Sequence, residues 1–133
     1  MMRILFCISF QVIAFHSGKA QINLSSSDTS IIGIWKGTSL CQVKNSACHD
    51  EIVVYHISKA DGIDAFNIQA NKMVNNIEED MGTLRCKFER KSNQLISSGG
   101  KGIWTFNVKD KSIDGALILQ GTLYRIVKLS KQN

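Results

Sequence analysis

The chain has 133 residues, 44% of them hydrophobic and 20% charged, and a net charge of +5 at neutral pH. This composition is typical of a folded domain and excludes a disordered chain, and the length suits a single domain. The basic residues are scattered and do not cluster with aromatic residues, which argues against nucleic acid as a partner.

The first twenty residues have the three-part pattern of a secretory signal peptide. A short basic start is followed by the apolar run ILFCISFQVIAF and then by small residues at Gly18 and Ala20. The apolar run is too short to span a bilayer, and no later run is long enough to do so. We expect cleavage after Ala20 and a periplasmic or secreted protein; a buried N-terminal strand or helix is the alternative. The polar, serine-rich residues 21–30 are expected to form a flexible leader, and residues 31–133 the folded domain.

From residue 31 onward the chain consists of short runs rich in β-branched and aromatic residues, separated by turn-forming residues. Several runs alternate apolar and polar residues; Leu84, Cys86 and Phe88, for example, share one face. The runs that we predict to be strands are 33–41, 51–58, 64–73, 83–90, 94–98, 102–109, 112–119 and 122–130. Short, evenly spaced strands joined by turns predict an all-β fold, an eight-stranded antiparallel up-and-down β-barrel.

Three cysteines, Cys41, Cys48 and Cys86, follow the expected cleavage site. An oxidising compartment allows a disulfide, and Cys41 and Cys48 flank the connection between the first two predicted strands. We expect these two to be bonded and Cys86 to be a buried apolar residue. A zinc site needs about four ligands, whereas Cys41, Cys48 and His49 offer three. A metal site and free thiols therefore remain as weaker alternatives, and no cofactor is predicted.

The first predicted strand opens with Gly33-Ile34-Trp35. A Gly-x-Trp at this position resembles the calycins, the superfamily of lipocalins, avidins and fatty-acid-binding proteins, and the chain is also similar to small exported bacterial proteins. The resemblance implies that Trp35 lies at the closed end of the barrel and that an Arg or Lys of the last strand packs over its ring. Arg125 lies on the apolar face of the last predicted strand, so we expect it to stack on Trp35. The alternative is that Arg125 extends into solvent.

If Trp35 marks the closed end, the connection 41–50 lies at the open end, together with an expected acidic loop at 72–82. Barrel mouths and long loops on rigid scaffolds are common ligand sites. His49, Glu51 and His56 are therefore candidate ligand-binding residues, with a charged, solvated rim as the alternative.

Catalysis is not predicted, because consecutive strand residues point to opposite faces and His49, Asp50 and Glu51 would not converge. The sequence thus predicts an exported, non-enzymatic barrel that binds a small molecule or a partner at its open end. A solid barrel that acts as a surface interaction or inhibitor module is the alternative, and an enzyme using these three residues is the less favoured one.

Overall fold

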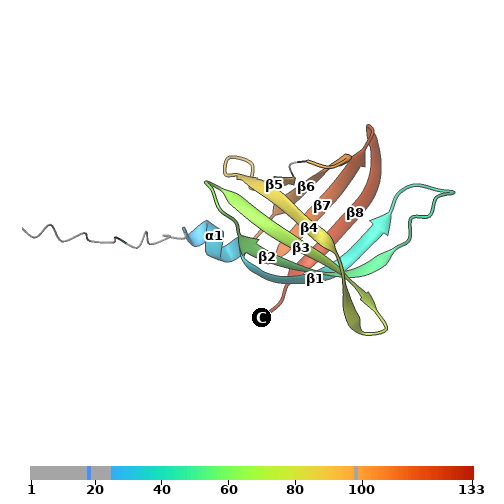
Figure 1. Cartoon of the computed structure of the whole chain (residues 1–133), viewed down its shortest axis with the longest axis horizontal. Helices are drawn as coiled ribbons and strands as arrows, with labels where there is room; N and C mark the ends of the chain where they lie inside the picture. Colours follow the sequence, from blue (N-terminus) through green and yellow to red (C-terminus); the bar gives the residue numbers. More distant parts are fainter. Residues whose placement is uncertain (1–17, 19–24, 98) are drawn as a thin grey trace, which may run out of the picture.

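The computed structural model describes residue 18 and residues 25–97 and 99–133, in which eight antiparallel strands close into one barrel (Figure 1). A short helix, α1 (Ser26–Ile31), precedes it. The strands are β1 (Gly33–Cys41), β2 (Glu51–Lys59), β3 (Ala65–Val74), β4 (Ile77–Glu89), β5 (Gln94–Ser97), β6 (Gly102–Val108), β7 (Ser112–Leu119) and β8 (Thr122–Lys131). Each strand pairs with the next and β8 pairs with β1, so the predicted all-β, eight-stranded up-and-down barrel is confirmed. This architecture is compatible with a calycin-like fold.

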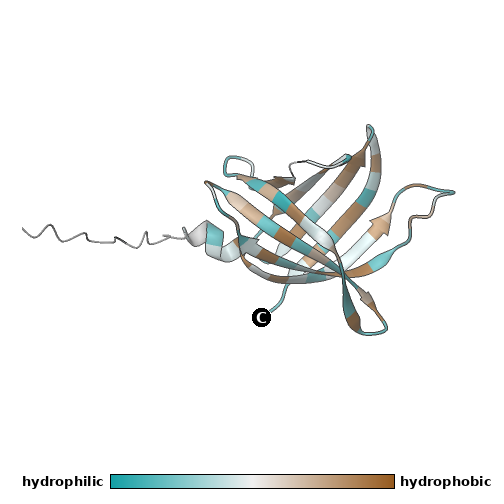
Figure 2. Cartoon of the chain, viewed as in Figure 1, coloured by the Kyte–Doolittle hydropathy of each residue, from teal (hydrophilic) through white to brown (hydrophobic). Residues whose placement is uncertain are grey.

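The alternation of apolar and polar residues along the strands places one face of the barrel wall in the core (Figure 2). The largest fully buried side chains are Trp35, Phe66 and Phe106. Cys86, at 1% exposure, packs among the core residues as predicted. Its burial raises the pKa of the thiol to about 12.

The segment before β1 differs from the flexible leader that we expected, because Ser26–Ile31 form α1. Ser25 and Asp28 form a capping box, in which each side chain accepts a hydrogen bond from the other residue's backbone N–H. Asp28 also pairs with Arg90 at 3.2 Å, and Ile31 is only 1% exposed in the core. These contacts stabilise a helix that its own residues would not sustain. Residues 21–24 and the expected cleavage site lie outside the described residues.

The expected acidic loop at 72–82 is instead a β-hairpin. β3 and β4 continue to a two-residue turn at Asn75 and Asn76, whose φ angles are 52° and 63°. Positive φ at both positions is the requirement of a type I′ hairpin turn, and Asn tolerates it better than most residues. The carboxylates of Glu78, Glu79 and Asp80 therefore belong to strand β4 and not to a loop at the mouth.

Trp35 lies at the end of the barrel that α1 covers, and its indole N–H donates a hydrogen bond to the carbonyl oxygen of Ile31 at 2.9 Å. A basic residue of the last strand does pack over its ring, but it is Lys131, with Nζ 5.5 Å from the ring centroid. The expected stacking of Arg125 on Trp35 is therefore wrong. In the β1–β8 pairing Trp35 faces Lys131, whereas Arg125 faces Cys41 at the opposite end of β1.

Candidate functional site

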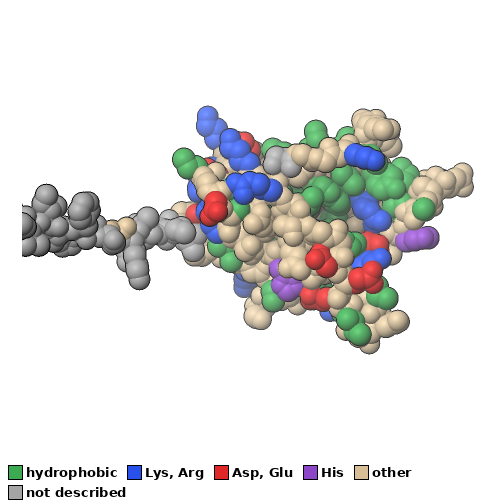
Figure 3. Space-filling view, in the orientation of Figure 1, with side chains coloured by type: hydrophobic (Ala, Val, Ile, Leu, Met, Phe, Trp, Pro, Cys, Tyr) green, Lys and Arg blue, Asp and Glu red, His purple; other side chains and the backbone are tan. Residues whose placement is uncertain are grey.

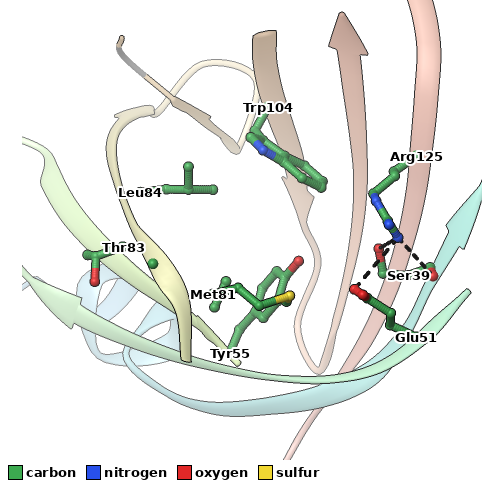
Figure 4. Close-up of a pocket in the computed structure, with 10 residues that line it drawn as sticks. Ser39, Glu51, Tyr55, Met81, Thr83, Leu84, Trp104 and Arg125 are labelled. Carbon is green, nitrogen blue, oxygen red and sulfur yellow. Dashed lines mark hydrogen bonds and ion pairs between the residues drawn. The ribbon is translucent and has the colours of Figure 1, made fainter. Parts of the chain in front are cut away.

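A cavity of about 280 Å³ lies in the half of the barrel away from α1 (Figure 4). Side chains from β1, β2, β3, β4, β6 and β8 line it. The Phe106 ring stacks on the ring of Trp104, which lines the cavity, with 5.4 Å between the ring centroids, and it meets the Tyr55 ring edge-on at 6.2 Å. The aromatic residues thus fill part of the interior without filling all of it. The volume is close to the lower limit of small-molecule pockets, roughly 300 Å³.

One wall of the cavity is polar and is built around Arg125. Its Nη1 donates hydrogen bonds to Ser39 Oγ at 3.1 Å and to the His49 carbonyl oxygen at 3.0 Å. The same nitrogen lies 3.8 Å from Glu51 Oε2, which is an ion pair but is too long for a hydrogen bond. The side chains of Arg125 and Glu51 are 15% and 21% exposed, so both charges are largely withdrawn from water.

The predicted disulfide between Cys41 and Cys48 is confirmed, with 5.9 Å between their α-carbons. It closes the connection between β1 and β2 at the edge of the cavity. The backbone N–H of Cys41 also donates to Asp50 Oδ1 at 2.7 Å. The disulfide, this hydrogen bond and the bond from Arg125 to His49 together hold the loop against the barrel.

Tyr55 extends the polar wall, and its hydroxyl points into the space between Trp104 and Glu51 in Figure 4. Burial raises the pKa of Tyr55 above its usual value, an effect that Arg125 partly opposes and Glu51 slightly reinforces. The hydroxyl is therefore protonated at neutral pH and can both donate and accept a hydrogen bond.

The opposite wall is apolar, formed by the side chains of Leu84, Met81, Trp104 and Ala70. Figure 3 shows hydrophobic side chains gathered in a hollow on one face of the molecule, with charged side chains beside them. A molecule in the cavity would therefore meet an apolar surface on one side and hydrogen-bonding groups on the other.

The barrel wall is incomplete beside the cavity. β5 has four residues, and its pairing with β4 covers only Cys86 to Glu89. Among the described residues, β4 from Ile77 to Arg85 consequently pairs with β3 alone. Met81 and Leu84 lie within this stretch of β4, and they line the cavity together with Trp104 of β6. The short β5 thus leaves the cavity-lining part of β4 without a hydrogen-bonded neighbour on its β5 side among the described residues.

The three predicted ligand-binding residues occupy three different environments. Glu51 lies in the cavity wall, although ligand contact itself stays a prediction. His49 contributes its backbone carbonyl to the Arg125 site, while its side chain is exposed. His56 faces the outside of the barrel, since its neighbour Tyr55 faces inward, and its Nε2 lies 2.9 Å from Glu78 Oε2. His56 is therefore not part of the cavity.

The cavity is also lined by residues that were not predicted from the sequence to be ligand-binding residues: Ser39, Tyr55, Trp104 and Arg125. A signal for two of them was present, because polar Ser39 and charged Arg125 lie on faces that are otherwise apolar, toward the mouth ends of their strands. Such residues in a barrel strand indicate a lined cavity rather than a packed core.

No family model matches the chain, and comparisons with curated proteins and with solved structures found no significant match. Within the described residues, no cluster of three or more His, Cys, Asp or Glu side chains is arranged to hold a metal ion. No described helix has the length and hydrophobicity needed to cross a membrane.

Proposed function

We propose that this chain is a calycin-like, non-enzymatic binding protein that takes a small molecule into the cavity at its open end. The observation that carries the proposal is the cavity itself, with Arg125, Glu51 and Tyr55 on one wall and an apolar surface opposite. Ligand sites typically combine an apolar lining with a few placed polar groups. The Gly-x-Trp opening of β1 and the cation of Lys131 over Trp35 support the calycin-like assignment.

A binding role is favoured over catalysis by the directions of the three adjacent polar residues at the start of β2. Glu51 faces the cavity, His49 is exposed, and the Asp50 carboxylate accepts a hydrogen bond from Cys41. A general base, its orienting partner and a nucleophile must lie within hydrogen-bond reach of each other. These residues do not form such a set.

Export is part of the proposal. The Cys41–Cys48 disulfide is compatible with an oxidising compartment, and the N-terminal sequence has the pattern of a signal peptide. Intact mass measurement of the protein recovered outside the cytoplasm should show a chain that begins at Gln21. Recovery of the uncleaved chain from the cytoplasm alone would contradict export.

Binding in the cavity can be tested with a neutral fluorescent dye, phenylnaphthylamine, which brightens in apolar surroundings. Ala70 points into the cavity, whereas its neighbour Gln69 is exposed on the outside of β3. We expect dye binding to the unmodified protein and to the matched control Gln69→Phe, and its loss in Ala70→Phe, where a phenyl ring occupies the cavity. Equal binding by both variants would place the dye on the outer surface and refute a cavity ligand.

A second candidate function is capture of a macromolecule by the rim. Ile52, Ile77 and Met81 are 54%, 70% and 42% exposed around the open end. Exposed apolar side chains near one another can mark an interaction surface. A partner held in this way should be lost on Ile77→Lys and retained by Ala70→Phe, which is the opposite of the result expected for a cavity ligand.

A further inference from the structure

The polar wall of the cavity has hydrogen-bonding groups that no described residue satisfies. All described hydrogen bonds of the Arg125 guanidinium come from Nη1, so no described residue accepts from Nε or Nη2. The Glu51 carboxylate is in an ion pair with Arg125 but accepts no hydrogen bond from a described residue. The Tyr55 hydroxyl likewise has no hydrogen-bond partner within the described part of the chain. The wall thus presents strong donors beside a strong acceptor.

The charges of Arg125 and Glu51 offset each other within this wall. With 3.8 Å between Nη1 and Oε2, a ligand group that reaches one of these side chains is also close to the other. An anion attracted by Arg125 is repelled by Glu51, and a cation attracted by Glu51 is repelled by Arg125. A charged ligand would also lose its hydration without gaining a net opposite charge. An uncharged group that donates and accepts side by side satisfies both residues.

A zwitterion, such as a free aromatic amino acid, fits the wall less well. Its ammonium group donates up to three hydrogen bonds, and the one carboxylate among the described cavity-lining side chains, Glu51, is already in an ion pair with Arg125 at 3.8 Å. Two full charges would also have to be desolvated in a site where the protein's own pair is already neutral.

The apolar wall opposite determines which nonpolar group of a ligand can fit in the cavity. The Trp104 indole is stacked on Phe106 with an interplanar angle of 4°, and in Figure 4 it lies over the cavity. Leu84 and Met81 continue this apolar wall beside it. A flat ring can pack against the indole, and aromatic pairs of this kind gain energy beyond simple burial.

We propose that the cavity recognises a small, uncharged aromatic molecule carrying an amide-like edge, in which a carbonyl accepts from Arg125 and the adjacent N–H donates to Glu51. The Tyr55 hydroxyl supplies a further hydrogen bond, and the ring lies against Trp104. This proposal rests on the proposed binding function and adds the chemical class of the ligand.

The test compares three probes of nearly equal shape, the neutral benzamide, the anionic benzoate and the cationic benzamidine, with phenylalanine as the zwitterion. Ligand-observed NMR suits molecules of this size, whose dissociation constants are on the order of 1 mM. At neutral pH and low salt, benzamide should bind the oxidised protein about tenfold more tightly than each of the other three, and Ala70→Phe should abolish this binding.

Glu51→Gln provides a reversal that a purely hydrophobic cavity would not show. Removing this negative charge should raise benzoate affinity about tenfold and lower that of benzamidine, because Arg125 is then unopposed. Glu89→Gln makes the same change of net charge on an exposed side chain of β4 that does not line the cavity, and should leave all affinities unchanged.

The proposal is overturned if benzoate, benzamidine or phenylalanine binds the unmodified protein as tightly as benzamide, or if Glu51→Gln leaves the ranking of the probes unchanged. Absence of binding by all four probes also overturns it. The dye experiment separates these failures from failure of the binding function. If the probes fail in one of these ways but dye binding is lost only in Ala70→Phe, a cavity ligand is retained and the amide-like class alone is refuted.

Discussion

Replacing Arg125 by methionine should destabilise the fold, because this residue links β8 to β1 and to the stapled loop. A hydrogen bond from a charged group contributes about 1.5–3 kcal/mol to stability. The bond from Arg125 to Ser39 Oγ should contribute nearly this amount, because Ser39 is only 2% exposed and water cannot easily replace it. The bond to the His49 carbonyl lies near solvent and can be replaced by water. The pair with Glu51 adds up to about 1 kcal/mol. Because methionine keeps most of the apolar stem, we expect a loss of about 2–3 kcal/mol.

Urea unfolding followed by tryptophan fluorescence measures this loss, and an unchanged m-value shows that the two proteins can be compared. The melting temperature should fall by about 10–20 °C for a domain of this size. Lys128→Met is the matched control, since Lys128 is an exposed residue of the same strand and does not line the cavity. A double-mutant cycle with Glu51→Gln should give a coupling energy of about 1 kcal/mol or less. If Arg125→Met costs less than about 0.5 kcal/mol, the anchoring argument is refuted.

Four other predictions concern the barrel wall, the hairpin and the cysteines. Gly37→Ala should lower the free energy of unfolding by about 3 kcal/mol or more, because the added methyl overlaps a backbone carbonyl of β8; a loss below about 1 kcal/mol in urea would contradict this. Hydrogen bonds from the side chains of Asn71 in β3 and His56 in β2 hold the pKa of Glu78 below its ordinary value of 4.5. The stabilisation from the Glu78 carboxylate is therefore present above its unfolded-state pKa and is lost as pH falls through its lower folded-state pKa. Glu78→Gln should consequently weaken the fall in the free energy of unfolding at acid pH, and an unchanged dependence on pH would count against these hydrogen bonds. Reducing the Cys41–Cys48 disulfide should cost about 2.5 kcal/mol, and an unmoved urea midpoint would show that the loop is held without it. Cys86, with its pKa raised to about 12, should resist thiol reagents at pH 8 until the protein unfolds, and mass mapping of a label on the native protein would disprove its burial.

The strand pattern was predictable because it depends on local alternation. The exposed and buried residues of β6, and of β8 from Val127 to Ser130, follow the alternation that the sequence predicts. The resemblance, not the alternation, placed Trp35 at one end of the barrel, and it lies at the end that α1 covers. The disulfide was predictable for a similar reason, since Cys41 and Cys48 flank a single connection between paired strands. In these cases the relevant partners are close in sequence.

The departures from prediction arise where distant segments meet. α1 is stable because Asp28 reaches Arg90 and Ile31 enters the core, and a six-residue polar segment carries little sign of either contact. The hairpin at Asn75 and Asn76 lacks the glycine that usually marks such a turn, so its acidic residues resembled a loop. His56 lies in a strand whose two faces are both largely apolar, which left its direction undetermined by pattern alone.

The sequence by itself determined an all-β barrel with a staple at its mouth, because hydrophobic period, turn residues and cysteine spacing are local properties. Only the tertiary structure decided which residues face the cavity and how far along the barrel axis each of them lies. The alternation of side chains assigns each residue to one face of a strand, but it does not determine the register between β8 and β1. That register is fixed by closure of the whole barrel. The register places Lys131 over Trp35 and brings Arg125 to Ser39 and Glu51, which converts an expected structural arginine into the centre of the candidate site.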